Sequence, residues 1–280
     1  MIRLARARED FELCAAIKNE VDPDDPVTAG QISGADGVLL LHGAGGYVYV
    51  APSSIARGAY TMVRVRPEVR RSGVGAALLA AASEHARSLG RETMWGRVAE
   101  DDEGSLSFAR HRSFEEVSRD VTVLLEVAPG DGELAPGIVE LEEEHLRGAH
   151  AVAVECVPEI ALPQVAEARP FDEWLEAETR TSPVCFVALD HDRVVGYARL
   201  EVLPAQPHRL ENGLTAVLRS HRRRGIATAL KRAQIKWGAD NGYREIVTSM
   251  VEGNEGMRAV NERLGYRPLP ASIVVSGPVR

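Results

Sequence analysis

The sequence predicts two similar domains of the mixed α/β (α+β) class, each a mixed, mostly antiparallel sheet flanked by helices. An Arg-x-x-Gly-x-Gly/Ala pattern occurs twice, at Arg70 and at Arg222, which are 152 positions apart. The order of predicted strands and helices also recurs in the two halves. The same offset continues downstream without a gap and pairs Leu78 with Leu230, Ala81 with Ala233, Gly90 with Gly242, Gly104 with Gly256 and Phe114 with Tyr266. A shared spacing of this length indicates duplication of a whole domain.

Composition sets limits on the class of protein. The 280 residues are 45% hydrophobic and 26% charged, which is enough for two cores in domains of about 140 residues each. A net charge of −8 argues against nucleic acid or an anionic membrane as a partner. Three widely spaced cysteines suggest neither a disulfide framework nor a metal site. Because no apolar run resembles a signal peptide or a membrane span, we expect a cytoplasmic protein.

The elements of the first half follow from periodicity and turn residues. Apolar residues at Phe11, Leu13, Ala16 and Ile17 predict an amphipathic helix over 10–20. An Ala- and Leu-rich segment predicts a helix over 76–89, and Gly90 occupies the position of a left-handed C-cap. Shorter helices are expected at 28–32 and 105–112, and strands at 2–5, 38–41, 47–51, 59–65, 92–98 and 117–127.

Turn-forming residues place the domain boundary. Gly and Pro cluster between Pro129 and Gly137, where periodicity lapses. We therefore expect an N-terminal domain over 1–128, a linker over 129–136 and a C-terminal domain over 137–280. The second half repeats the order of the first, with helices expected at 146–154, 171–179, 228–241 and 256–264, and strands at 138–141, 185–189, 194–202, 214–218, 245–251 and 272–276.

The two Gly loops carry the chemistry. A strand that runs into a loop of small residues and then a helix directs unpaired backbone N–H groups and the positive end of the helix dipole at one spot, which suits a phosphate. Exposed arginines at a helix entrance are the plainer interpretation, but duplication in the same context argues against it. The loop lacks the Gly-Lys-Ser/Thr of a P-loop and the Gly-x-Gly-x-x-Gly of a dinucleotide fold, so ATP and NAD are disfavoured.

These motifs resemble the signature of the GNAT superfamily of acyl-CoA-dependent N-acyltransferases, which is Gln/Arg-x-x-Gly-x-Gly/Ala after a strand ending in Val. Val65 and Val217 hold that strand position. Downstream, Asn254, Met257 and Asn261 resemble the family's C-terminal Asn-x-x-Ala/Met motif, and the N-terminal half matches it more loosely. The likeness covers most of both halves. The arrangement is similar to the tandem two-domain type that includes mycothiol synthase.

The resemblance implies acetyl-CoA as co-substrate. It places the pantetheine arm between the strands at 214–218 and 245–251 and the pyrophosphate on backbone amides of 223–228, with a backbone N–H near Val217 polarising the thioester carbonyl. The implied contacts in the C-terminal domain are Val217, Leu218, Arg222, Arg223, Arg224, Gly225, Ile226, Ala227, Thr228, Asn254, Met257 and Asn261. Those in the N-terminal domain are Val65, Arg70, Arg71, Ser72, Gly73, Val74, Gly75 and Ala76.

The chain departs from the family at two catalytic positions. The tyrosine that many members use as a general acid is replaced by Asn261 in one half and Ala109 in the other. The glutamate often found four residues before the strand valine is also missing, because Gly213 and Thr61 stand there. A general base must therefore come from elsewhere or be water.

Three residues of the C-terminal half are candidates for that base. Glu211 is the first choice, because it enters the strand that must face the thioester; Glu201 and His208 are the others. A charged residue at a strand end is more often merely solvated, so each candidate has that alternative.

The leading hypothesis is an N-acetyltransferase whose C-terminal domain transfers an acyl group to a primary amine. The N-terminal domain then either still binds coenzyme A or is a degenerate scaffold that completes the acceptor pocket. The alternatives are a non-catalytic acyl-CoA sensor, an acyltransferase whose donor is an acyl carrier protein, and reversed roles of the two domains. We expect a small-molecule amine acceptor and a monomer. The identity of the acceptor does not follow from the sequence, because acceptor pockets are built from variable loops.

Overall fold

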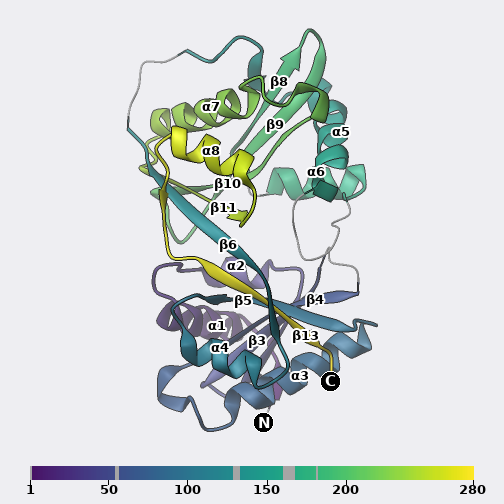
Figure 1. Ribbon diagram of the computed structural model, residues 1–280. Helices are drawn as coiled ribbons and strands as arrows, with labels where there is room; N and C mark the ends of the chain where they lie inside the picture. The colour runs from purple at the N-terminus through teal and green to yellow at the C-terminus, as the bar shows by residue number, and fades with distance from the viewer. Residues whose placement is uncertain (1, 54–56, 129–132, 160–167, 181) are drawn as a thin grey trace. The chain divides into compact units, whose positions relative to one another are not determined.

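The computed structural model describes residues 2–53, 57–128, 133–159, 168–180 and 182–280. By its internal contacts the chain divides into two compact units (Figure 1). The first unit holds Met1–Arg119 and Ser272–Arg280, and the second holds Asp120–Ala271. Each unit has a mostly antiparallel sheet with helices against it, so the predicted fold class is confirmed.

The sheet of the first unit has the order β1-β2-β3-β4-β5-β13, in which β4 and β5 pair in parallel. Alternate residues of β3 face opposite sides: Tyr47 packs with Ile17 of α1, and Val48 packs with Leu78 of α3. The strands are β1 (Ile2–Leu4), β2 (Val38–His42), β3 (Gly46–Pro52), β4 (Gly58–Val65), β5 (Thr93–Ala99) and β13 (Ser272–Pro278). The helices are α1 (Arg8–Val21), α2 (Ala29–Ser33), η1 (Pro67–Val69), α3 (Val74–Ser88) and α4 (Glu103–Arg110).

The sheet of the second unit has the order β6-β11-β10-β9-β8-β7, with β12 also paired to β6. Tyr197 of β9 faces α6, where its ring lies 6.1 Å from that of Trp174, and Gly196 faces Leu230 of α7. The strands are β6 (Glu115–Glu126), β7 (Ile138–Glu140), β8 (Val184–Asp190), β9 (Arg193–Val202), β10 (Arg209–Val217), β11 (Glu245–Val251) and β12 (Arg267–Pro268). The helices are η2 (Glu143–His145), α5 (Leu146–Cys156), η3 (Val157–Glu159), α6 (Phe171–Arg180), η4 (Arg219–His221), α7 (Ile226–Asp240) and α8 (Glu255–Arg263).

The predicted repeat is visible in the backbone itself. The elements η1, α3 and β5 begin 152 residues before η4, α7 and β11. Arg71 and Arg223 both have positive φ, at 63° and 62°. Gly73 and Gly225 follow in the left-handed region, at 90° and 84°, and cap the helices. Two loops with the same sequence pattern thus adopt the same conformation.

Each repeat gives its last strand to the other unit. Strand β6 pairs with β11 from Asp120 to Glu126, and β13 pairs with β5 from Ser272 to Pro278. The contact-based units therefore differ from the expected ranges of 1–128 and 137–280: residues 120–128 belong to the second unit and 272–280 to the first. Local periodicity identified both strands but carries no information on their partners. Part of the expected linker, 129–132, lies outside the described residues.

No helix in the described part of the chain combines the length and the apolar character that crossing a membrane requires.

Candidate functional site

The loop before α7 presents an open helix N-terminus. Gly225 is the N-cap residue, and no side chain caps the helix there. A Cβ built on Gly225 would meet nothing within 4 Å, so the space in front of the loop is open. The backbone N–H groups of the first turn, at Ile226, Ala227 and Thr228, have no acceptor within the helix itself. This arrangement suits an anion such as a phosphate.

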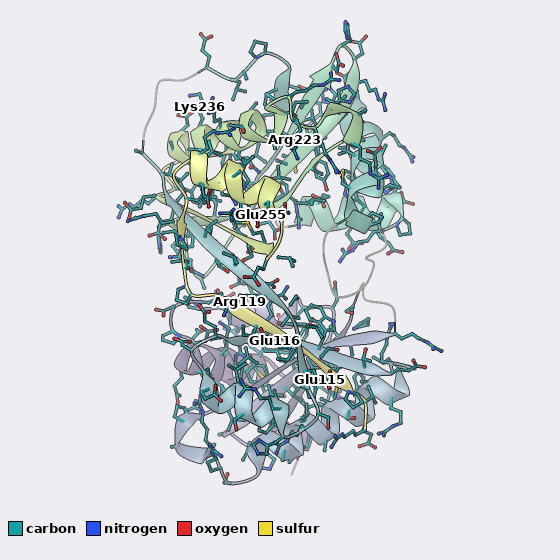
Figure 2. The ribbon with its side chains drawn as sticks, in the orientation of Figure 1. Glu115, Glu116, Arg119, Arg223, Lys236 and Glu255 are labelled. Atoms are coloured by element: carbon teal, nitrogen blue, oxygen red, sulfur yellow. The ribbon has the colours of Figure 1, made fainter. Side chains whose placement is uncertain are left out.

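The three arginines of this loop are exposed, and two of them also donate to backbone carbonyls. Arg222 donates from Nε to the carbonyl of Val217 at 3.0 Å, and Arg70 makes the same contact to Val65 at 3.2 Å. These two side chains therefore brace the end of the preceding strand. Arg223 and Arg224 are exposed beside the loop, and Figure 2 shows Arg223 there. Arg222 is exposed too, and Arg224 likewise donates to a backbone carbonyl, that of Ser220, at 3.1 Å.

Strands β10 and β11 separate along their length. They pair in parallel over three positions, from Arg209 with Glu245 to Glu211 with Val247, and then diverge. Two polar atoms of this region are buried without a hydrogen-bond partner among the described residues: Oγ1 of Thr215 on β10, and Oδ1 of Asn261 on α8, whose Nδ2 lies 3.9 Å from Sδ of Met250 on β11. Such atoms need partners. An arm that carries amide groups, as pantetheine does, offers the kind of partner that these two oxygens lack.

Strand β10 carries a β-bulge. Its register against β9 shifts between Asn212 and Thr215, whereas β3 and β4 pair without a shift from Gly46–Val65 to Pro52–Ala59. Glu211 opposes Val247 as Tyr60 opposes Trp95, so six steps lead from Glu211 to Val217 where five lead from Tyr60 to Val65. The second unit thus has one extra residue in this strand. A bulge leaves backbone groups outside the ladder, where they can bind a substrate.

A cluster of charged side chains lies on one face of β9 and β10. Glu201 and Glu211 are directly opposite each other in the ladder. Arg199 contacts Glu201 at 2.6 Å and Glu178 of α6 at 3.2 Å. Burial raises the pKa of Glu178, and Arg199 partly opposes that rise. An amine that binds here meets more carboxylates than cations.

The equivalent face of the first unit is aromatic. Tyr49, Ala51 and Tyr60 hold the ladder positions of Arg199, Glu201 and Glu211. The ring of Tyr60 lies 4.8 Å from that of Trp95 and 6.2 Å from that of Tyr49. The two repeats therefore share the glycine loop before the helix, at 70–75 in the first unit and 222–227 in the second, which is named here the anion loop. They differ in the chemistry of this face.

One of the predicted catalytic residues, Glu211, needs correction of its position. Glu211 lies inside β10, which begins at Arg209, and not just before a strand that begins at 214. Its pairing with Glu201 brings two of the three candidates together. His208 lies 3.7 Å from Glu245 at the start of the parallel pair, where Arg209 also contacts Glu245.

The start of α8 has a capping role that the motif did not reveal. Asn254 is the N-cap residue, and its side chain accepts a hydrogen bond from the backbone of Met257 at 3.1 Å. Asp102 does the same for Ser105 at 2.9 Å in the first unit. Contacts of Asn254 and Met257 with the acyl donor, acetyl-CoA, remain a prediction.

A buried lysine was missed by the sequence analysis. Lys231 of α7 is 1% exposed, and its Nζ donates to Oδ1 of Asn212 at 2.9 Å. Burial lowers its pKa to about 7. Comparison of the two halves could have identified it, because Leu79 stands at the corresponding position of the first half, and an apolar residue there indicates a buried position.

The lowered pKa of this lysine predicts that the free energy of unfolding depends on pH. Its pKa is about 7 in the folded chain and about 10.4 when unfolded, so between these values the unfolded chain binds more protons. Its contribution to the free energy of unfolding is therefore lowest below pH 7 and rises up to about pH 10. We expect the free energy of unfolding of wild type minus that of Lys231→Met to increase by a few kcal/mol between pH 6.5 and 9.5. Urea titrations at both pH values measure this, and equal differences would contradict it.

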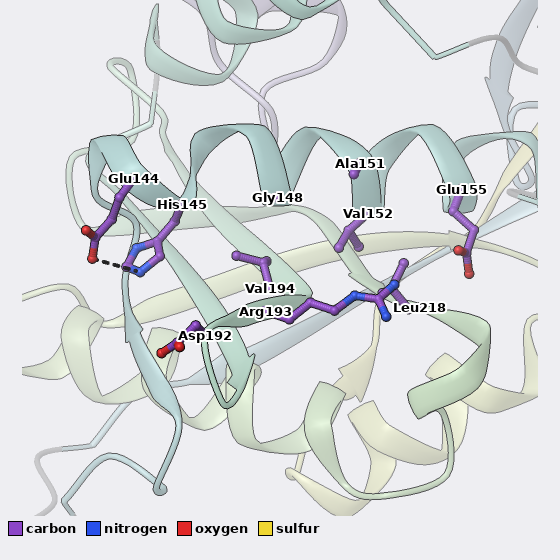
Figure 3. A pocket seen from close by; sticks show the side chains of 10 residues that line it. All are labelled: Glu144, His145, Gly148, Ala151, Val152, Glu155, Asp192, Arg193, Val194 and Leu218. Atoms are coloured by element: carbon purple, nitrogen blue, oxygen red, sulfur yellow. Dashed lines mark ion pairs between the residues drawn. The ribbon is translucent and has the colours of Figure 1, made fainter.

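Two pockets lie in the second unit. One of about 320 Å³ is bordered by Arg224, Gly225 and Ile226, so it adjoins the anion loop. Another of about 400 Å³ lies beside α5, with Glu155, Asp192 and Arg193 among its lining (Figure 3). Of the predicted site residues only Leu218 lines this second pocket.

Comparison with known proteins finds both a sequence relative and similar solved structures. A relative, N-alpha-acetyltransferase 30 of Schizosaccharomyces pombe (strain 972 / ATCC 24843), is 34% identical over 83 residues, which are 29% of this chain and 55% of the relative. The chain thus matches about half the length of this relative.

Two solved structures match the chain over its whole length. A GCN5-related N-acetyltransferase from Sphaerobacter thermophilus has a TM-score of 0.80 at 18% identity, with 100% of this chain and 96% of the other covered. A tandem GNAT protein from the clavulanic acid biosynthesis pathway, solved without AcCoA, has a TM-score of 0.76 at 20% identity, with 100% and 98% covered. They share the fold. The family model for the acetyltransferase (GNAT) family matches residues 35–114 and 152–266, so the chain belongs to this family and carries its fold in tandem.

Proposed function

We propose that this protein is an acyl-CoA-dependent N-acyltransferase that moves an acetyl group to a primary amine, with its active site in the second unit. The observation that carries the assignment to this unit is the bulge of β10, which β4 lacks. The bulge lies beside the charged face, next to the wedge between β10 and β11. The first unit has the anion loop but an unbroken ladder and an aromatic face.

The donor is held from three sides in this proposal. Backbone N–H groups of 225–228 and the side chains of Arg223 and Arg224 bind the pyrophosphate. Thr215 and Asn261, whose buried oxygens lack partners among the described residues, bind the amides of pantetheine. A backbone N–H of the bulge donates to the thioester carbonyl, where negative charge develops during attack. The bound donor supplies the activated acyl group.

Attack by a neutral amine completes the reaction. The amine nitrogen forms a bond to the carbonyl carbon, and the carbon–sulfur bond breaks to release the CoA thiolate. The amine must lose a proton, and Glu211, which lies before the bulge, accepts it directly or through one water. The thiolate takes a proton from solvent, because Asn261 replaces the tyrosine of related enzymes and has no titratable proton.

The acceptor in this proposal is a small molecule. Arg199 contacts Glu178 and Glu201, Glu211 lies opposite Glu201, and Arg169 also acts on Glu178, so the described carboxylates of this face outnumber its cations and favour a cationic amine over an anionic one. The first unit, with its intact loop, contributes a second CoA site without transfer chemistry.

Release of free thiol from acetyl-CoA in the presence of a panel of amines tests the function. We expect release that depends on a primary amine and saturates with acetyl-CoA. If calorimetry shows acetyl-CoA binding without release for any amine, the protein is a sensor. If free thiol is released only when the acyl group is supplied on a carrier protein, the donor is that carrier protein and not acetyl-CoA.

A further inference from the structure

We infer that Lys231, Asn212, Gln234 and Tyr266 form a positioning cluster that holds the bulge of β10 open and thereby sets the geometry for acyl transfer. The cluster is named here the bulge clamp. This inference rests on the proposed function of the second unit, and it adds residues that touch neither the donor nor the acceptor in the proposed arrangement.

The bulge clamp is a connected set of buried hydrogen bonds. Oδ1 of Asn212 accepts from Nζ of Lys231 at 2.9 Å and from the hydroxyl of Tyr266 at 2.8 Å. Nδ2 of Asn212 donates to Oε1 of Gln234 at 2.9 Å. The four side chains are at most 5% exposed. In such surroundings each bond restricts its partners strongly, because water cannot replace it.

The bonds reach both strands at the irregular position. Asn212 is the last residue of β10 in register before the shift. On the other strand, Gln234 donates from Nε2 to the backbone carbonyl of Arg199 at 2.7 Å. Arg199 is the residue of β9 that the register skips, since Ala198 pairs with Thr215 and Leu200 with Asn212. Helix α7 thus supplies side-chain bonds to the two strands where their own ladder is interrupted.

The first unit provides an internal comparison. Thr61 takes the ladder position of Asn212, and its hydroxyl is buried without a partner among the described residues. The repeat offset places Leu79, Ala82 and Phe114 where the second unit has Lys231, Gln234 and Tyr266. None of these three side chains can make the hydrogen bonds of the clamp. In this unit β4 runs straight.

A purely stabilising role accounts poorly for the lysine. Among the described residues no carboxylate lies within ion-pair distance of Nζ, and the facing groups are neutral: Asn212 from β10, Gln234 from α7 and the ring of Tyr266, 5.1 Å away. Burial raises the pKa of Tyr266, so this phenol stays protonated. Burying an ammonium without a counter-ion destabilises the fold, and an apolar side chain of similar length avoids that.

Lys231→Met removes the hydrogen-bond donor of the side chain and keeps its length. Leu79→Met is the matched control, because it places the same residue at the corresponding position of the other repeat. We expect kcat for acetyl transfer to fall about tenfold to 100-fold in Lys231→Met, because a small displacement of the bulge misaligns its N–H. KM for acetyl-CoA should change less than threefold, and at pH 6.5, where the buried lysine is charged, the melting temperature should stay level or rise. Leu79→Met should leave kcat within twofold of wild type.

A double-mutant cycle tests whether the clamp acts as a unit. Asn212→Ala alone should lower kcat as much as the double variant with Lys231→Met, because the lysine acts through Asn212. Independent effects that multiply would contradict a shared role.

Amide hydrogen exchange gives a readout without turnover. Exchange in the peptide covering β10 should accelerate in Lys231→Met and not in Leu79→Met. Unchanged exchange, or a kcat within twofold of wild type, overturns the inference. Accelerated exchange in a protein whose wild type acylates no amine supports the clamp and refutes the proposed function instead.

Discussion

Gly225→Glu is expected to weaken acetyl-CoA binding to the second unit by at least about 100-fold, because a carboxylate beside a phosphate costs several kcal/mol. The space in front of Gly225 is open, so the new side chain has room to reach the first-turn N–H groups of α7 and neutralise the helix end. Isothermal titration calorimetry with acetyl-CoA measures the change, together with the loss of acyl transfer.

Gly73→Glu is the matched control for this substitution. Gly73 has a φ of 90° against 84° for Gly225, both cap a helix of the same length, and a Cβ on either meets nothing within 4 Å. The strain of a left-handed non-glycine residue, about 1 kcal/mol or more, is therefore common to both variants. We expect Gly73→Glu to remove at most a second binding event and to leave transfer intact. Loss of transfer with Gly73→Glu alone would move the active site to the first unit.

The anion loops were predictable because they are local. A glycine at the N-cap and the residues around it determine the backbone of a few positions, and a repeated pattern then implies a repeated conformation. Most helix and strand boundaries also agree with the sequence prediction within two residues, because the apolar spacing that defines them lies within each segment. The expected strand at 92–98, for example, is β5 (Thr93–Ala99).

The features that distinguish the two units were not predictable in the same way. Strand β10 begins five residues before the expected strand, because the polar segment from His208 to Gly213 lacks a clear alternation of apolar residues. The bulge is a relation between two strands, and a single strand's sequence does not reveal its register. The pairing of β6 with β11 and of β13 with β5 likewise depends on strands far away in the sequence, which local periodicity does not identify. Lys231 was the exception that comparison of the repeats could have found.

The location of Glu211 inside β10 leads to the second large effect. We expect Glu211→Gln to lower kcat/KM for the amine by about 100-fold to 10,000-fold at neutral pH, the range typical of a lost general base. The amide keeps the size and hydrogen-bonding capacity of the side chain but cannot accept the proton. Acetyl-CoA affinity should stay within threefold of wild type, since the anion loop and the bulge are unchanged. Initial rates measured against pH report the loss of the general base, and calorimetry with acetyl-CoA reports whether donor binding has changed.

Glu201→Gln is the matched control, because Glu201 lies opposite Glu211 on the neighbouring strand. Oε1 of its carboxylate contacts Arg199 at 2.6 Å, so one of its two oxygens is already engaged in an ion pair. Such a charge-assisted contact fixes the orientation of both side chains, which suits a group that positions the amine. We therefore expect Glu201→Gln to raise KM for the amine more than it lowers kcat. The reverse result, in which Glu211→Gln is nearly active and Glu201→Gln is inactive, would assign the role of general base to Glu201.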